Sequence, residues 1–150
     1  MKILVCTDGS KQSEKALEKA SLIADGCNAT DVAIIHVYET SPLDFHRSEG
    51  YTPTQEDKER LKQLSEQEKE ERKKLLSEAL KFFEGKNVNT RTIFKEGHPA
   101  ENIVEVGCGE EFDFIVIGSR GLGGVKRTIL GSVSNAVVQQ AEGCSLVVVR

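Results

Sequence analysis

The chain has 150 residues, of which 38% are hydrophobic and 29% are charged, and its formal net charge is −4. This length fits one domain, residues 1–150, with a core of its own, and the composition excludes an intrinsically disordered chain. The mild acidity, and the lack of any apolar run near the ~20 residues that span a bilayer, argue against nucleic acid or a membrane as partner.

Strand-like and helix-like patterns alternate from the first residues onward. Residues 3–6 form a short apolar run that ends in a turn signal at residues 7–10. Because this start contains no apolar signal core, we expect a cytoplasmic protein. A helix with Gly26 as its stop follows, and residues 32–37 are a second apolar run. The apolar residues at helical spacing in the first helix are Ala16, Leu17, Ala20, Ile23 and Ala24.

The segment 39–85 is longer than a minimal connection between strands. Residues 39–53 are expected to form a loop and residues 54–83 a long charged helix, whose middle, residues 65–74, has no apolar residue. That part cannot pack into a core, so a solvated helix face is expected, with a partner site as the alternative. Pairs spaced by four residues support the helix: Glu56–Arg60, Glu68–Arg72 and Glu70–Lys74. The side chains expected to return to the core are Leu75, Leu76, Ala79, Leu80 and Phe83.

The second half of the chain continues the alternation. Residues 90–94 are expected to form a more exposed strand, and residues 114–117 and 146–149 are apolar strands. A helix starts at Pro99, and another starts at Ser132, which is expected to be its N-cap. Their inward residues are Ala100, Ile103, Val104 and Cys108 in the first, and Val133, Ala136, Val137 and Ala141 in the second.

Strands that are apolar at every position are buried on both faces, and alternation with helices implies a parallel sheet with right-handed crossovers. The predicted fold is therefore α/β, a five-stranded parallel doubly wound sheet in the order 3-2-1-4-5 with helices on both faces. This order opens a crevice between the carboxyl ends of strands 1 and 4, where open α/β sheets bind their ligands.

A glycine-rich stretch leaves strand 4 at this crevice. It comprises residues 118–124 and residues 131–134, at the start of the last helix. Glycines let backbone N–H groups approach an anion, and a helix start adds unpaired N–H groups and a positive dipole end. A phosphate cradle is one interpretation, and a flexible loop is the other. A Walker A loop is absent because Lys126 follows Val125, and no dinucleotide fingerprint follows the first strand.

The remaining candidate residues carry weaker signals. The four cysteines form no C-x-x-C pair or zinc spacing, so we expect reduced structural thiols, with Cys6 beside the proposed site. His36 lies in an apolar strand and is expected to be a satisfied core histidine rather than a catalytic base. His98 is assigned to the start of the helix at Pro99.

Four segments together give a resemblance to a known family. The spacing G-x-x-G-(nine residues)-G-[ST] is met by Gly118, Gly121, Gly131 and Ser132. With residues 3–10, 35–37 and 97–103, it resembles the ATP-binding branch of the universal stress protein family. The resemblance covers nearly the whole chain, apart from the variable segment 39–85. It implies a Rossmann-like fold of the adenine nucleotide alpha hydrolase-like kind.

The resemblance also implies roles for individual residues around ATP. Asp8 would accept hydrogen bonds from the ribose, although it could instead only cap the turn that follows. The adenine edge would meet the backbone of Val37, near Thr7 and Ile117. Gly118 and Ser119 would line the ribose and first phosphate, with Arg120 nearby. The groups implied for the phosphates are Gly121, Gly131, Ser132, Val133 and Ser134. Mg²⁺ or Mn²⁺ would be held mainly by phosphate oxygens, with no protein metal site.

No positioned base or nucleophile is evident beside a terminal phosphate, so a nucleotide-dependent switch or sensor in a stress response is expected. The alternative is a slow ATPase or phosphotransferase, since phosphoryl transfer can proceed by positioning alone. As a switch, the protein would alter a surface that an unknown protein partner recognises. A last strand at the sheet edge would invite pairing with a second copy, and the resemblance supports a homodimer through residues 145–150.

Overall fold

The computed structural model describes residues 1–39, 54–122 and 130–150. The loop expected at residues 39–53 lies outside these ranges except for Glu39, and so does the middle of the glycine-rich stretch, residues 123–129. Within the described part of the chain, no helix is both long enough and apolar enough to cross a membrane.

A parallel sheet of five strands forms the centre of the molecule, in the order β3-β2-β1-β4-β5. This order confirms the prediction. The strands are β1 (Lys2–Cys6), β2 (Asp31–Tyr38), β3 (Asn89–Glu96), β4 (Phe114–Gly118) and β5 (Ser145–Val149). β3 is an edge strand with mostly exposed residues, which agrees with the weaker apolar pattern in its sequence.

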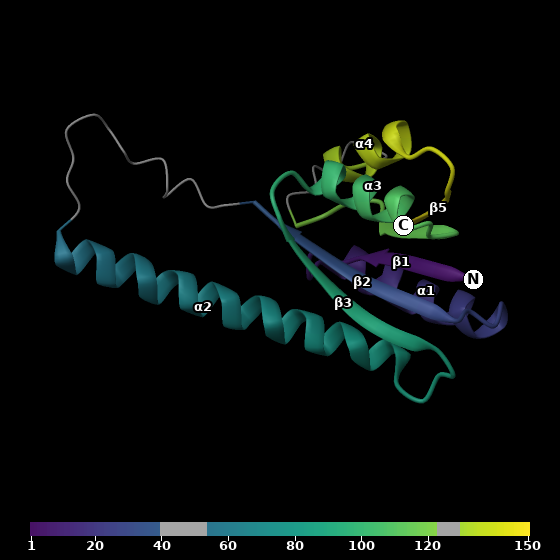
Figure 1. Cartoon of the computed structure of the whole chain (residues 1–150), viewed down its shortest axis with the longest axis horizontal. Coiled ribbons are helices and arrows are strands. Elements are labelled where there is room, and N and C mark those ends of the chain that lie inside the picture. Colours follow the sequence, from purple (N-terminus) through teal and green to yellow (C-terminus); the bar gives the residue numbers. More distant parts are fainter. Residues whose placement is uncertain (40–53, 123–129) are drawn as a thin grey trace.

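Helices cover both faces of this sheet (Figure 1). Helix α1 and the C-terminal end of α2 pack on one face, and α3 and α4 pack on the other. The helices are α1 (Lys11–Gly26), α2 (Gln55–Leu80) with a following 3-10 turn (Lys81–Phe83), α3 (Pro99–Gly109) and α4 (Ser132–Gln140). His98 is the N-cap of α3, as expected.

The central strands supply both cores because successive side chains point to opposite faces. In β1, Ile3 and Val5 belong to the core beneath α1, whereas Leu4 and Cys6 belong to the core beneath α3 and α4. All four are buried. A strand that is covered on both faces therefore needs apolar residues at every position.

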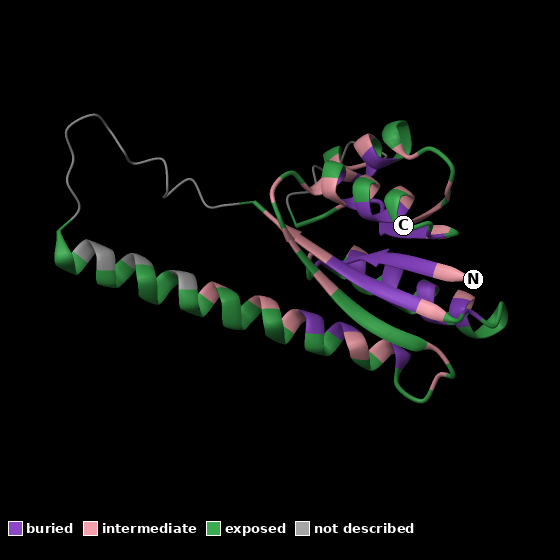
Figure 2. Ribbon diagram, viewed as in Figure 1, coloured by how far each residue is buried: buried purple, intermediate pink, exposed green. Residues whose placement is uncertain are grey.

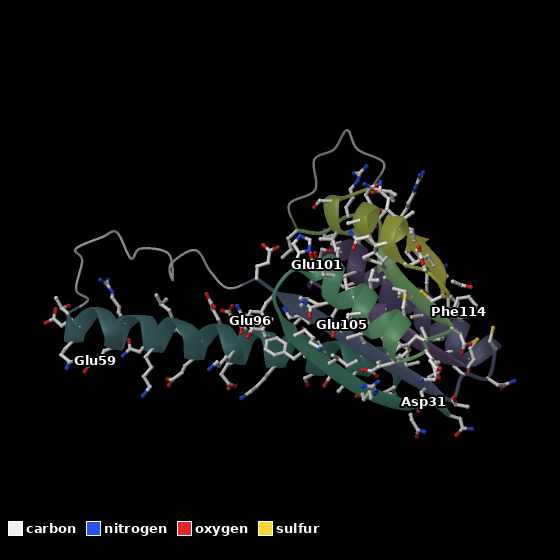
Figure 3. The ribbon with its side chains drawn as sticks, turned by 45° about the horizontal axis from the view of Figure 1, so that its top comes forward. Asp31, Glu59, Glu96, Glu101, Glu105 and Phe114 are labelled. Carbon is white, nitrogen blue, oxygen red and sulfur yellow. The ribbon has the colours of Figure 1, made fainter. Side chains whose placement is uncertain are left out.

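Helix α2 extends beyond the edge of the sheet, and its first turns are exposed (Figures 1 and 2). Glu59, near its far end, is distant from the body of the molecule (Figure 3). The expected Glu68–Arg72 pair is present, whereas Glu70 pairs with Lys73 rather than with the predicted Lys74. Most described residues in this segment are exposed, as expected for a charged helix face.

Contacts in the C-terminal half of α2 hold this helix against the sheet. The guanidinium of Arg72 lies over the ring of Tyr38, 4.1 Å from its centroid. The Tyr38 hydroxyl donates a hydrogen bond of 2.9 Å to Glu96 at the end of β3, which Figure 3 labels. Leu76 and Ala79 are buried, as expected from the return of apolar residues in this part of the sequence.

Candidate functional site

The candidate site lies where the carboxyl ends of β1 and β4 meet, as the sheet order predicts. A cavity of about 1110 Å³ opens there. Its walls come from the ends of β1, β2 and β4 and from the first turns of α3 and α4. Segments far apart in the sequence therefore contribute to one hollow.

The predicted binding residues gather around this cavity, and all of them except Ser119 line it. The lining members are Thr7, Asp8, Val37, Ile117, Gly118, Arg120, Gly121, Gly131, Ser132, Val133 and Ser134. Ser119 is buried behind the lining. Its N–H donates to the carbonyl of Val149 at 2.6 Å, and its own carbonyl accepts from the N–H of Gly131 at 2.7 Å.

Asp8 joins the turn after β1 to the glycine-rich segment. Its Oδ1 accepts the N–H of Ser10 at 3.0 Å, the turn-capping contact that was one of its two expected roles. Its Oδ2 accepts the N–H of Leu122, another lining residue, at 3.1 Å. A Cβ on Gly121 would lie 2.5 Å from Oδ2, so a larger residue there would force the Asp8 carboxylate to move.

Ser134 contacts the two ends of the glycine-rich segment 119–131. Its hydroxyl donates to the carbonyl of Ser119 at 2.9 Å and lies 3.1 Å from the carbonyl of Gly131. The side chain is buried, with 2% of its surface exposed. Together with the bond from Gly131 to Ser119, this contact brings the two ends of segment 119–131 into direct contact.

The N-cap of helix α4 lies one residue earlier than expected. The N-cap is Gly131, and Ser132 is the first helical residue, so the assignment of Ser132 as N-cap is wrong. The first hydrogen bond of the helix runs from Asn135 N–H to the carbonyl of Gly131 at 2.9 Å. Helix geometry leaves the N–H groups of the first turn without intrahelical acceptors, and these residues line the cavity. The site therefore contains a concentration of N–H donors and the positive end of a helix dipole.

Another part of the lining is apolar. It includes Ile35 and Val37 from β2, Pro99 and Ile103 from α3, and Ile117 from β4. A cavity with one apolar wall and one wall rich in N–H donors suits a ligand that joins a flat ring to an anionic group.

His36 braces the turn from outside the cavity lining. Its Nδ1 lies 2.8 Å from the carbonyl oxygen of Thr7. Because a carbonyl only accepts, Nδ1 carries the proton and donates. The ring also stacks on Phe94, with 5.9 Å between centroids. The expectation of a satisfied histidine agrees with these contacts.

Cys6 forms part of the cavity wall and is buried. Burial, and secondarily the charge of Asp8, raise the pKa of its thiol well above the usual range. The thiol is therefore protonated at neutral pH and acts as a small apolar group, since the thiolate is the reactive form.

Among the residues lining the cavity, Asp8 is the one carboxylate. In the described part of the chain, no three His, Cys, Asp or Glu residues gather as a metal cluster. A divalent ion at this site would therefore take most of its ligands from a bound anion and from water.

Several lining residues were not among the predicted ones. They are Cys6, Ser13, Ile35, Pro99, Ile103, Leu122, Leu130 and Asn135. Pro99 and Ile103 were recognised as the start of a helix, but their contribution to the cavity depends on how α3 packs on the sheet. Leu122 takes part through its backbone, which carries no side-chain signal in the sequence.

Comparison with known proteins gives a consistent result. The model of the Universal stress protein family matches residues 1–150. The chain is 33% identical over 151 aligned residues to Universal stress protein YxiE of Bacillus subtilis, covering 99% of this chain and 98% of that protein.

Solved structures share the architecture. The chain is similar to the hypothetical protein MJ0577, with a TM-score of 0.79 and 27% identity. The alignment covers 99% of this chain and 94% of that one. It also resembles the universal stress protein from Archaeoglobus fulgidus solved in complex with dAMP, with a TM-score of 0.67 and 20% identity. That alignment covers 100% of this chain and 98% of the other, and at this identity it shows the shared fold.

Proposed function

The chain belongs to the universal stress protein family, and on this premise we propose that its cavity binds an adenine nucleotide, with ATP as the expected ligand. The observation that carries the proposal is the pairing of an apolar wall with the N–H groups at the start of α4 in one cavity at the sheet switch point. The relative solved with dAMP supports an adenine nucleotide as the class of ligand.

In this proposal the base occupies the apolar side. The backbone of Val37 holds the adenine edge, with Thr7 and Ile117 beside it. The buried state of Thr7 supports a fixed wall there, because its N–H donates to Ile35 and its hydroxyl meets that of Ser13 at 3.2 Å. The ribose hydroxyls bind Asp8.

The phosphates bind along the glycine-rich side. Gly118 lines the ribose and first phosphate, with Arg120 nearby. Ser119 supports this side from behind the lining, where its N–H and carbonyl pair with Val149 and Gly131. Ser134 contributes its N–H rather than its hydroxyl, which donates to carbonyls. The other phosphate-binding groups are Gly121, Gly131, Ser132 and Val133. Mg²⁺ or Mn²⁺ bridges phosphate oxygens and takes few protein ligands.

Asp8 provides a route from binding to conformational change. Its Oδ2 accepts the N–H of Leu122. Ribose hydroxyls that bind the same carboxylate share or displace that hydrogen bond, so nucleotide occupancy changes how the glycine-rich segment is held. This coupling suits a switch or sensor whose altered surface a protein partner recognises.

A slow ATPase or phosphotransferase is the alternative. It would require a group that takes a proton beside the terminal phosphate. Both oxygens of Asp8, the lining carboxylate, already accept backbone N–H groups, which favours binding over turnover.

The proposal is tested with nucleotide released by acid from freshly purified protein and with calorimetric titration of ATP, ADP and AMP. Gly131→Val adds a side chain at the N-cap of α4, whose Cβ would lie 3.4 Å from the Cα of Arg120 and 3.5 Å from the carbonyl oxygen of Ser119. The added bulk should displace the glycine-rich segment and weaken ATP binding at least tenfold. Gly109→Val is the matched control, since a Cβ at Gly109 meets nothing within 4 Å. A folded wild-type protein that shows no heat at millimolar nucleotide would contradict the proposal. If the wild-type protein hydrolyses radiolabelled ATP above background and Gly131→Val does not, the alternative of a slow ATPase or phosphotransferase would be favoured.

We further propose that the protein works as a cytoplasmic homodimer joined through the C-terminal strand. The support is the position of β5 at the edge of the sheet, with Leu146, Val147 and Val148 only partly covered. An uncovered edge with apolar side chains favours antiparallel pairing with a second copy.

A further inference from the structure

Two thiols that are 36 positions apart in the sequence lie in contact near the amino end of β5, whereas Asp8 lies at the carboxyl ends of the strands. Cys108 is in the last turn of α3, and Cys144 is in the turn that precedes β5. Their Sγ atoms are 3.4 Å apart. A disulfide bond measures about 2.05 Å, so an approach of about 1.4 Å would convert this contact into a bond.

We propose that Cys108 and Cys144 are a modification site at which a hydroperoxide joins them in a reversible disulfide. One thiolate attacks the O–O bond of the peroxide, becomes a sulfenic acid and releases hydroxide, or an alkoxide from an organic peroxide. The second thiol attacks the sulfenic sulfur, the S–S bond forms and water leaves. In total two thiols lose two electrons and two protons, and hydrogen peroxide is reduced to two waters.

The surroundings of the pair favour a small neutral oxidant. Both thiols border a surface hollow of about 700 Å³, which gives access from solvent. Three carboxylates also line it, from Glu111, Asp113 and Glu142. A negatively charged disulfide such as oxidised glutathione is repelled by this charge, whereas hydrogen peroxide is not.

One of the two thiols, Cys144, has a raised pKa. Burial raises the pKa of Cys144 to about 11, and the hydrogen bond and charge of Cys108 act in the same direction. Thiolate at Cys144 is therefore scarce at neutral pH, and oxidation of the pair should accelerate as the pH rises from 7 toward that value.

Tryptic digestion can identify the bond without ambiguity. Cleavage after lysine and arginine leaves the four cysteines on four different peptides, residues 3–11, 20–47, 96–120 and 128–150. After treatment of the full chain with hydrogen peroxide, and blocking of remaining thiols, the expected product links peptides 96–120 and 128–150. The chain should lose two of its four free thiols, remain the same size without reductant, and recover both thiols with dithiothreitol.

Matched variants complete the test. Cys27→Ser removes an exposed thiol and should leave the linked peptides unchanged. Cys108→Ser and Cys144→Ser should each abolish them, and both conservative changes are expected to keep the fold. Any other linked pair, a disulfide between two chains, or oxidation of the pair to sulfinic acid without a cross-link would overturn the inference. These results are independent of nucleotide binding.

Discussion

At the scale of single residues, two side chains hold the ends of the glycine-rich segment. Asp8 accepts the N–H of Leu122 just after β4, and Ser134 donates to the carbonyls of Ser119 and Gly131. Both residues were expected to touch the ligand. The structure shows that both residues form hydrogen bonds to the backbone of the glycine-rich segment. Substitutions at either residue should therefore affect stability as well as the cavity.

Ser134→Ala should lower the free energy of unfolding by about 1–2 kcal/mol, because it removes a buried hydroxyl and its hydrogen bond to the carbonyl of Ser119. Ser132→Ala is the control in the same helix, since Ser132 is exposed and should change stability by about 0.5 kcal/mol or less. Urea unfolding without nucleotide measures both. Equal losses in the two variants would contradict the bracing role of Ser134.

At the scale of elements, α2 is a helix with two parts. Its first turns are exposed, and its last turns join the core through Leu76 and Ala79. Arg72 lies between these parts and stacks on Tyr38. The boundary between solvated and packed helix is thus set by an aromatic contact from β2 as well as by apolar burial.

Arg72→Ala should increase hydrogen exchange in the middle of α2 and lower the free energy of unfolding by about 0.5–1 kcal/mol, the range of an exposed cation–π contact. Arg72→Lys should give values of both quantities between those of the wild-type protein and of Arg72→Ala, because lysine keeps the charge and loses the planar stacking. Arg60→Ala, on the exposed part of α2, is the matched control. If Arg60→Ala and Arg72→Ala change exchange equally, the stacking does not fasten the helix.

At the scale of the whole molecule, β5 leaves one edge of the sheet open. The N–H of Ser145 donates to Asp113 and the carbonyl of Val149 accepts from Ser119, so the backbone groups of these residues face β4. Since direction alternates along a strand, the backbone groups of Leu146 and Val148 face away from the sheet. Those are the groups that a second copy would meet.

Val148→Pro removes one outward N–H and should convert a dimer into a single chain of 16.5 kDa. Val147→Pro instead removes a bond toward β4 and should lower stability. Light scattering gives the mass, and circular dichroism checks that each variant is folded. A folded Val148→Pro protein that keeps twice the single-chain mass would count against this interface.

Local patterns predicted the sheet order and the crevice at its switch point, whereas most of the individual cavity residues were implied by the family resemblance. Uninterrupted apolar runs mark buried parallel strands, and the glycine spacing marks the turn beside them. The sequence did not reveal the buried position of Ser119, the shift of the N-cap to Gly131, or the Cys108–Cys144 contact. Each of these features depends on contacts with residues that are distant in the sequence. The local spacing of apolar residues does not indicate such contacts.

The hydrogen bonds that connect the two ends of segment 119–131 affect how well the protein should tolerate insertions between them. Since Gly131 and Ser134 both bind the carbonyl of Ser119, residues between these points can be added while the neighbouring strand and helix keep their positions. Doubling a loop costs only about 0.6 kcal/mol in closure entropy. Insertions in this interval should therefore spare the scaffold and alter ligand preference, which makes it the natural place to engineer new selectivity.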